Sequence, residues 1–318
     1  MLWDRWQDFP DYIIGITKEI WEDRGIATLH GYYAPEIVMR TPMGITRGNR
    51  GVIAGTMATI DEFPDRRLLA EDVIWSEHET GLLSSHRLIT SATHTRPGLF
   101  GEPTGRRFTI RVIADCAARD GAIFDEWLVR DYSGIARQMG LEPRAFAARL
   151  LAEEKGSNPP FTPAQDVDGG YHGRGNGNEW GQRYEDLLTR IMQTDFRAIH
   201  QEYDRAVIGE YPGAVQGIGR EQAVEFWLGL RSAFPDATFR IHHRIGMDGG
   251  MMPPRAAIRW SLDGTHSGWG SFGRPTGAPV HVMGIAHAEF GPWGLRREYA
   301  LIDEIAIWKQ ILNHTGEP

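Results

Sequence analysis

The sequence predicts an α+β fold that occurs twice in one chain. Three observations predict it: a series of motifs that repeats at a constant offset of 172 residues, helical patterns that precede strand patterns in each half, and a glycine- and proline-rich segment between the halves. Helices followed by a run of strands are typical of α+β domains. The length of 318 residues also suits two domains, since one domain usually has about 100 to 200 residues.

The repeat is visible without gaps over 39 residues of each half. Residues 93–131 contain Thr-His-Thr, Gly-Glu-Pro-Thr-Gly, an apolar strand and Asp-Glu-Trp-Leu-Val-Arg-Asp, and residues 265–303 contain Thr-His-Ser, Gly-Arg-Pro-Thr-Gly, an apolar strand and Arg-Glu-Tyr-Ala-Leu-Ile-Asp. Upstream, Phe-Pro-Asp follows a helical pattern in both halves, at an offset of 171. A repeat of this length indicates two copies of one domain. We therefore expect domain 1 over residues 1–155, a linker over 156–182 and domain 2 over 183–318.

The local patterns assign the elements of each half in order. Apolar residues with helical spacing predict helices over 12–21 and 50–63 in the first half and over 184–207 and 220–234 in the second. The Phe-Pro step ends two of them, because a residue before proline is driven out of the α region. Runs rich in β-branched and aromatic residues predict strands over 69–75, 82–95, 107–116 and 123–131. Each Pro-Thr-Gly segment is typical of a tight turn between strands.

Composition excludes several classes of function. Apolar residues make up 41% and charged residues 24%, so each half can form a core, and a net charge of −8 without basic, aromatic-rich runs argues against nucleic-acid binding. The charged start of the chain and the lack of long apolar runs argue against a signal peptide or membrane span, so we expect a cytoplasmic protein. The lone Cys116 is expected in the core. The glycine-rich run at 169–177 lacks the context of a phosphate loop.

Taken together, these motifs resemble the SnoaL-like polyketide cyclase family of the nuclear transport factor 2-like superfamily. The residues that carry the resemblance are Phe-Pro-Asp, Thr-His-Thr/Ser, Pro-Thr-Gly and Glu-Trp/Tyr followed by Asp, each present twice. The resemblance implies two tandem cone-shaped domains, in which a curved, mostly antiparallel sheet wraps around N-terminal helices and encloses a deep pocket. It implies no cofactor, and no His cluster with metal-site geometry stands out. It also implies an internal pseudo-dimer through the outer faces of the sheets and leaves further oligomerisation open.

The strand that ends each repeat carries the candidate catalytic carboxylates. Alternate residues of a strand share a face, so Trp127 lies with Asp131 and Tyr299 with Asp303. If that face lines the pocket, burial raises the carboxyl pKa into the range of acid–base catalysis; the alternative is an aspartate that caps the following turn. The family's aldol-type cyclases imply a histidine on the preceding strand as partner, which gives Asp303 with His287. The first half offers Asp131 with Asp115 and lacks the histidine.

The same reasoning yields candidates for substrate contact. A small apolar or aromatic organic ligand is the expected partner, because aromatic walls suit flat apolar molecules. His94 and His266 follow a threonine at a strand end, where they serve either the pocket rim or the structure. The full set of candidates is His266, His94, Trp127, Tyr299, Trp227, Trp260, Trp269, His281 and Arg111.

Three functions follow from these candidates. The first is a cofactor-independent enzyme of the cyclase, isomerase or lyase type that uses the paired acid–base groups. The second is a non-catalytic ligand-binding protein of the same fold, because one fold hosts many functions. The third is epoxide hydrolysis, for which Arg111 near Asp115 and Asp131 would supply an Asp-Arg-Asp group. The substrate is set by loops that the sequence does not define.

Overall fold

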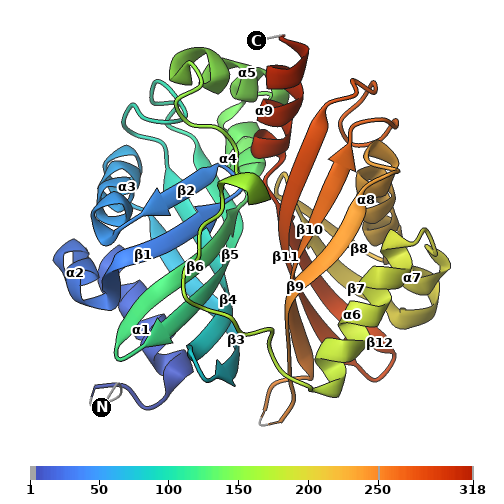
Figure 1. Cartoon of the computed structure of the whole chain (residues 1–318), viewed down its shortest axis with the longest axis horizontal. Helices are drawn as coiled ribbons and strands as arrows, with labels where there is room; N and C mark the ends of the chain where they lie inside the picture. The colour runs from blue at the N-terminus through green and yellow to red at the C-terminus, as the bar shows by residue number, and fades with distance from the viewer. Residues whose placement is uncertain (1–4, 250, 317–318) are drawn as a thin grey trace.

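The computed structural model describes residues 5–249 and 251–316 and contains two six-stranded mixed sheets, one from each half of the chain. Figure 1 shows the sheets facing each other, with most helices of each domain on the far side of its own sheet. The predicted tandem α+β fold is therefore confirmed. The first four residues of the charged N-terminal segment lie outside the described part. Within that part, no helix is long and apolar enough to cross a membrane.

Domain 1 begins with helices, continues with a hairpin and a long helix, and then forms four consecutive strands. Its elements are α1 (Phe9–Trp21), the 3₁₀ helix η1 (Ile26–Thr28), α2 (Leu29–Tyr32), β1 (Tyr33–Thr41), β2 (Gly44–Arg47), α3 (Asn49–Glu62), β3 (Arg67–His78), β4 (Gly81–Thr93), β5 (Arg107–Arg119), β6 (Ala122–Arg130), α4 (Tyr132–Met139) and α5 (Pro143–Glu154).

Domain 2 repeats this order after a segment that holds only the 3₁₀ helix η2 (Pro163–Gln165). Its elements are α6 (Glu179–Met192), α7 (Arg197–Glu202), β7 (Tyr203–Tyr211), β8 (Val215–Ile218), α8 (Arg220–Ala233), β9 (Thr238–Met247), β10 (Arg255–Thr265), β11 (Pro279–Gly291), β12 (Gly294–Ile302) and α9 (Glu304–Thr315).

The two sheets have the same topology. Their strand orders are β2-β1-β6-β5-β4-β3 and β8-β7-β12-β11-β10-β9. The central pairs β1–β6 and β7–β12 are parallel, and the other neighbours are antiparallel. We call the face that packs on the domain's own helices the inner face and the opposite one the outer face. Each inner face encloses an apolar core, and the two cores are separate over most of their extent.

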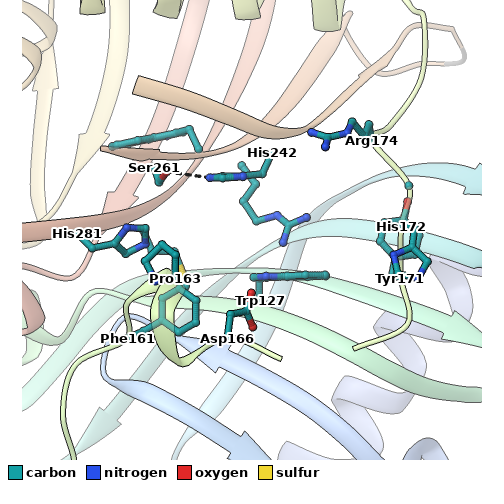
Figure 2. Close-up of a pocket in the computed structure, with 14 residues that line it drawn as sticks. Trp127, Phe161, Pro163, Asp166, Tyr171, His172, Arg174, His242, Ser261 and His281 are labelled. Carbon is teal, nitrogen blue, oxygen red and sulfur yellow. Dashed lines mark hydrogen bonds between the residues drawn. The ribbon is translucent and has the colours of Figure 1, made fainter. Parts of the chain in front are cut away.

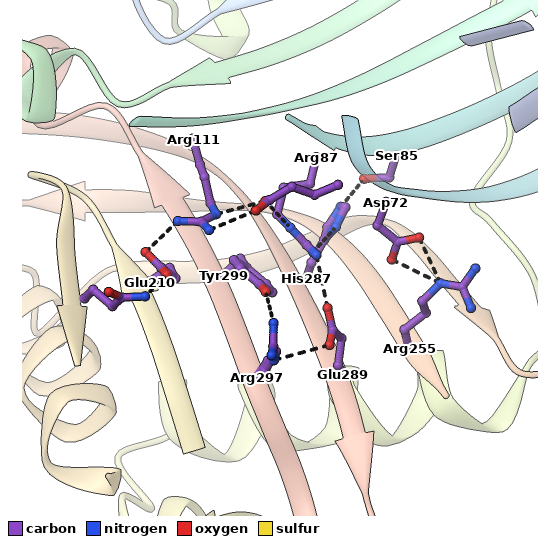
Figure 3. A network of polar contacts seen from close by, with 12 residues as sticks. Asp72, Ser85, Arg87, Arg111, Glu210, Arg255, His287, Glu289, Arg297 and Tyr299 are labelled. Atoms are coloured by element: carbon purple, nitrogen blue, oxygen red, sulfur yellow. Dashed lines mark hydrogen bonds and ion pairs between the residues drawn. The ribbon is translucent and has the colours of Figure 1, made fainter. Parts of the chain in front are cut away.

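The outer faces of the two sheets pack on each other and hold the domains together. Apolar clusters join them, one with Ile113 and Val129 of domain 1 against Ile285 and Leu301 of domain 2. A buried polar network joins them as well (Figure 3). At its centre the Arg87 guanidinium lies 3.0 Å from Glu71, 3.1 Å from Glu289 and 3.2 Å from His287. It also lies 3.5 Å from the centroid of the Tyr299 ring. Strands β5, β6, β11 and β12 therefore carry buried side chains on their outer faces at this contact.

Two further segments tie the domains together. The linker between α5 and α6 crosses the open side between the sheets, as Figure 1 shows in yellow-green. Its Phe161 amide donates to the Pro42 carbonyl at 3.0 Å, and its Asp166 pairs with Arg40. Helix α9, at the end of domain 2, packs on α5 of domain 1, so that Ile305 and Leu312 join the core of domain 1. The linker is an ordered part of the interface.

The structure corrects several predicted elements. The helix predicted over 184–207 ends at Met192, where Thr194 takes a left-handed φ of 70°, and the chain resumes as α7 and then as strand β7. The hairpins β1–β2 and β7–β8 were not predicted, because β2 and β8 have only four residues each and the longer β1 and β7 carry no clear alternation. Helices α4, α5 and α9 were not predicted either. Cys116 is buried in the core, as expected.

The aspartates that follow the last strands cap helices at the domain interface. Asp131 is the N-cap of α4 and accepts from the amides of Gly134 at 2.8 Å, Gly213 at 2.8 Å and Ala214 at 2.7 Å, the last two in the other domain. Asp303 caps α9 through the Ile305 amide at 2.9 Å, and its Oδ2 has no hydrogen-bond partner. Burial raises the pKa of Asp303 to about 8, with Asp131 adding to the shift.

The different hydrogen bonding of the two aspartates predicts that replacement by asparagine raises the stability at Asp303 and lowers it at Asp131. Because the folded-state pKa of Asp303 lies far above its unfolded value of about 3.9, its ionisation costs stability as pH rises from about 4 to 8. We expect Asp303→Asn to raise the free energy of unfolding by about 1 kcal/mol or more at pH 9 and by much less at pH 5, since asparagine still caps the helix. Urea unfolding at both pH values measures this.

Asp131→Asn serves as the matched variant. Its amide nitrogen would face backbone N–H groups that now donate to carboxylate oxygens, so we expect a loss of about 1–3 kcal/mol at both pH values. Equal pH dependence of the two variants would contradict the assignment of Asp303 as the uncompensated carboxyl group.

Candidate functional site

In each domain a glutamate of the last strand points into the space between the inner face of the sheet and the domain's own helices. We call this space the cone of the domain. Glu126 in β6 pairs with Cys116 of β5, and Glu298 in β12 pairs with Ala288 of β11, at the same register of the two sheets. Both side chains lie on the inner face, with Leu128 and Ala300 as their neighbours two residues further on. Both are buried. The two glutamates therefore occupy equivalent positions and can be compared directly.

Glu298 is saturated with hydrogen-bond donors. Its carboxylate accepts from the hydroxyls of Tyr184 at 2.9 Å, Tyr203 at 2.7 Å and Tyr211 at 2.7 Å, and from the indole N–H of Trp227 at 3.1 Å. Burial raises the pKa of Glu298 and these donors oppose the shift. A carboxylate held by four donors is fixed in place and has little capacity left to accept a proton from another molecule. Glu298 is thus a structural group.

Glu126 is much less constrained. Tyr33 and Cys116 are its hydrogen-bonding neighbours, and its Oε2 has no hydrogen-bond partner. Burial raises the pKa of Glu126 to about 7, and the positive charge of Arg130 opposes the rise. A carboxyl group that titrates near neutral pH can take up and release protons under physiological conditions. Glu126 is therefore the strongest acid–base candidate inside either cone.

The cavity around Glu126 has apolar walls and two cationic groups. Arg66 and Arg130 line it, and Arg66 is held by a hydrogen bond to the Thr90 hydroxyl at 3.1 Å and lies over the Trp21 ring at 5.4 Å. Burial lowers the pKa of Arg66 to about 10, which leaves it charged at neutral pH. The cavity volume is about 60 Å³, enough for a few water molecules and below the 300–1,000 Å³ typical of ligand sites. A substrate must displace side chains at its edge.

The cone of domain 2 is filled where that of domain 1 is hollow. Trp227 and Trp260 are fully buried in its core, and Trp260 also borders a cleft between the domains. The equivalent residues are smaller or charged in domain 1. The pairs, domain 1 first, are Thr56 and Trp227, Leu88 and Trp260, Arg66 and Ala237, and Arg130 and Ile302.

The face that carries the predicted catalytic residues is the outer one, so the expectation that it lines the cone is wrong. Strand alternation places Trp127, Tyr299, His287 and Asp115 between the sheets, opposite to Glu126. Asp131 and Asp303 take the alternative role that their position allows, as helix caps, and they lie close to each other rather than to a histidine. Their use as acid and base stays a prediction.

The structure does not bring Asp303 and His287 together. His287 Nε2 lies 2.8 Å from Ser85 Oγ, and Arg87 donates to its Nδ1 at 3.2 Å, both from domain 1. Burial lowers the pKa of His287 well below its usual range, so it is neutral and its two nitrogens are engaged. Asp115 faces Arg259 of domain 2 at 3.2 Å and is not paired with Asp131.

The remaining predicted contacts fall into three groups. His94 and His266 are buried structural residues that contact Thr104 at 3.3 Å and Thr276 at 3.0 Å. Trp269 is exposed at the surface. Trp127 and His281 line a cleft between the domains. The predictions therefore missed Glu126, although the repeat aligns it with Glu298, because the alternation was assigned to the wrong face.

Arg111 does not form the Asp-Arg-Asp group that epoxide hydrolysis would need. Its guanidinium pairs with Glu71 at 2.9 Å and with Glu210 of domain 2 at 2.7 Å. Arg111 and Asp131 border one interdomain cavity of about 270 Å³, but Asp115 lies with Arg259 elsewhere. Among residues 5–249 and 251–316, no three His, Cys, Asp or Glu side chains are grouped to hold a metal ion.

Comparison with known proteins agrees with this architecture. The family model described as SnoaL-like polyketide cyclase matches residues 12–139 and 180–311. Among solved structures, IdmH of Streptomyces antibioticus is 24% identical, covering 41% of this chain and 97% of its own, with a TM-score of 0.36. TsrD of Streptomyces laurentii is 22% identical and covers 41% and 93%, with a TM-score of 0.36.

A SnoaL-like polyketide cyclase from Agrobacterium tumefaciens is 19% identical and covers 42% and 98%, with a TM-score of 0.33. Each of these structures spans about one domain of this chain. Curated proteins give no significant match. The two matched regions together cover most of the sequence and coincide with the two sheets. The chain therefore belongs to the SnoaL-like polyketide cyclase family, with one copy of the family's domain in each half.

Proposed function

We propose that the protein is a cofactor-independent acid–base enzyme of the cyclase or isomerase type, whose active site is the cone of domain 1. The observation that carries the proposal is Glu126, a buried carboxyl group with an unpartnered Oε2 and a pKa of about 7. A group of this kind is suited to removing a proton from a carbon next to a carbonyl group. Domain 2, with its saturated Glu298 and filled cone, is the structural partner.

The charges around Glu126 support this chemistry. When Glu126 accepts a proton from a carbonyl substrate, the C–H electron pair moves toward the carbonyl oxygen and forms an enolate. Arg130 acts on Glu126 electrostatically, and Arg66 lines the same cavity, so both can stabilise the oxyanion in a site of low polarity. The enolate carbon then attacks a second carbonyl of the same molecule, whose oxygen takes the proton back from Glu126, or the enolate is reprotonated by Glu126 at another carbon. The first outcome is cyclisation and the second is isomerisation.

The apolar walls support a small organic carbonyl compound as the substrate class. Leu68, Leu88 and Leu128 line the cavity with the arginines. The closed volume of about 60 Å³ implies that the substrate enters by moving side chains at the edge, where Trp21 and Met39 are partly exposed. Entry of this kind favours a compact or flexible substrate over a rigid polycyclic one.

Exchange of α-protons in D₂O tests the proposal without knowledge of the natural substrate. With a β-keto ester as probe, ¹H NMR measures the rate of exchange above the rate in buffer. We expect Glu126→Gln to reduce the enzyme-dependent rate by about 10²-fold or more, the usual effect of removing a general base. Because the base form is the ionised one, the rate should rise with pH and level off above about 7.

Glu298→Gln is the matched control in the second domain. Glutamine keeps one acceptor oxygen among the tyrosine hydroxyls, and thermal unfolding monitors its folding. Exchange by this variant should stay within about twofold of the natural chain, since Glu298 lies outside the proposed active site. An unchanged rate in Glu126→Gln, or equal losses in both folded variants, would exclude domain 1 as the catalytic domain.

A further inference from the structure

A larger cavity lies between the domains, outside both cones. It has a volume of about 390 Å³, within the range of small-molecule sites. Its lining comes from β6, the linker and strands β9, β10 and β11, as Figure 2 shows for the labelled residues. Trp127, the neighbour of Glu126, points into it from the outer face. Its walls come from both domains and the linker, and it is independent of the function proposed for the cone.

The walls of this interdomain cleft combine aromatic rings with a stacked cation. The Arg259 guanidinium lies 3.5 Å from the centroid of the Trp127 ring. Phe161 of the linker packs against the His281 ring at 5.5 Å and is fixed by its backbone bond to Pro42. The Arg40 guanidinium lies 4.7 Å from the same Trp127 ring. A guanidinium over an indole ring can still direct its N–H groups to another partner. The aromatic surfaces suit a flat molecule, and the arginine edge suits an acceptor.

Several carboxylates around the cleft are paired with cationic or imidazole groups, and two of them share one arginine. Asp125 and Asp166 both pair with Arg40. Asp263 pairs with His281 at 2.6 Å and with Arg240 at 2.8 Å.

The arginine and histidine side chains that face the cleft have fewer hydrogen-bond partners than these carboxylates. Arg259 is nearly buried and its Nε makes no hydrogen bond, although Asp115, itself outside the lining, lies 3.2 Å away. Arg174 of the linker is exposed at the cleft and has no acidic partner among the described residues. The Nδ1 of His281 is engaged by Asp263, which leaves its Nε2 available. Burial and the nearby arginines lower the pKa of His242 to about 4, so this ring adds a neutral polar group.

From these contacts we propose that the interdomain cleft is a binding site for a flat conjugated anion, such as an aromatic carboxylate or phenolate. The ring packs beside Trp127 and Phe161, and the negative group is bound by Arg259 and Arg174. His281, oriented by the contact of its Nδ1 with Asp263, accepts at Nε2 a hydrogen bond from a second polar group of the ligand. Charge-assisted hydrogen bonds of this type are the strong ones, and the arginine geometry matches a carboxylate.

Calorimetric titration of the full chain with 2-naphthoate tests the site. Naphthoate should bind with a stoichiometry of one, and 2-naphthamide, its neutral counterpart of the same shape, should bind at least about tenfold more weakly because it lacks the charge. We expect Arg174→Gln to weaken naphthoate binding about fivefold or more and Phe161→Ala about tenfold. Arg174 makes no side-chain ion pair in the described structure, so its replacement should leave folding intact.

Two variants serve as controls. Arg197→Gln removes a highly exposed arginine of α7 that does not line the cleft, and it should not change naphthoate affinity. Glu126→Gln changes the cone and should also bind naphthoate normally, so failure of either proposal is distinguishable from failure of the other. Absence of naphthoate binding at millimolar concentration would overturn the proposal. Equal affinity for the amide, or unchanged affinity in both Arg174→Gln and Phe161→Ala, would overturn it as well.

Discussion

The contact between the outer faces of the two sheets is the constraint on which the rest of the structure depends. At its centre the Arg87 guanidinium reaches Glu71 of its own domain and Glu289 and His287 of the other, and lies over the Tyr299 ring. Removing one member of such a buried charge network lowers the stability strongly, because the remaining charges are left unpaired. The contact therefore fixes which side chains of β6 and β12 enter a cone and which face the other domain.

Within this frame the two copies have diverged in opposite directions. Domain 2 fills its cone with Trp227 and Trp260 and surrounds Glu298 with tyrosine hydroxyls, which gives a well-packed core. Domain 1 keeps a cavity with the buried ionisable groups Glu126 and Arg66. Buried charges lower the stability of the fold, and such groups cluster at functional sites. The packed copy can supply the stability that the hollow copy lacks, since the interface and α9 couple them.

The sequence was sufficient for the fold and insufficient for the site. The repeat from His94 to Asp131 and from His266 to Asp303 identified two equivalent domains. Two chains with the same topology keep the same spacing between turns and strands even where the side chains differ. It could not separate inner from outer faces, because strands buried on both sides read as continuous apolar runs. Trp127 and Tyr299 were assigned to the cone for this reason, although both lie between the sheets. The cleft was beyond prediction, since its walls come from segments whose approach depends on the packing of the domains.

Thiol accessibility at Ser85 tests the central claim most directly. Ser85 lies on the outer face of β4 in contact with His287, and the natural Cys116 is buried, so a cysteine placed at position 85 would be the reporter. Thr109→Cys, at an exposed position of the neighbouring strand β5, provides the reference. If the sheets pack as described, Ser85→Cys reacts with a maleimide about a hundredfold more slowly than Thr109→Cys under native conditions, because labelling requires local opening. Equal labelling rates in a folded chain would contradict the packing of the outer faces.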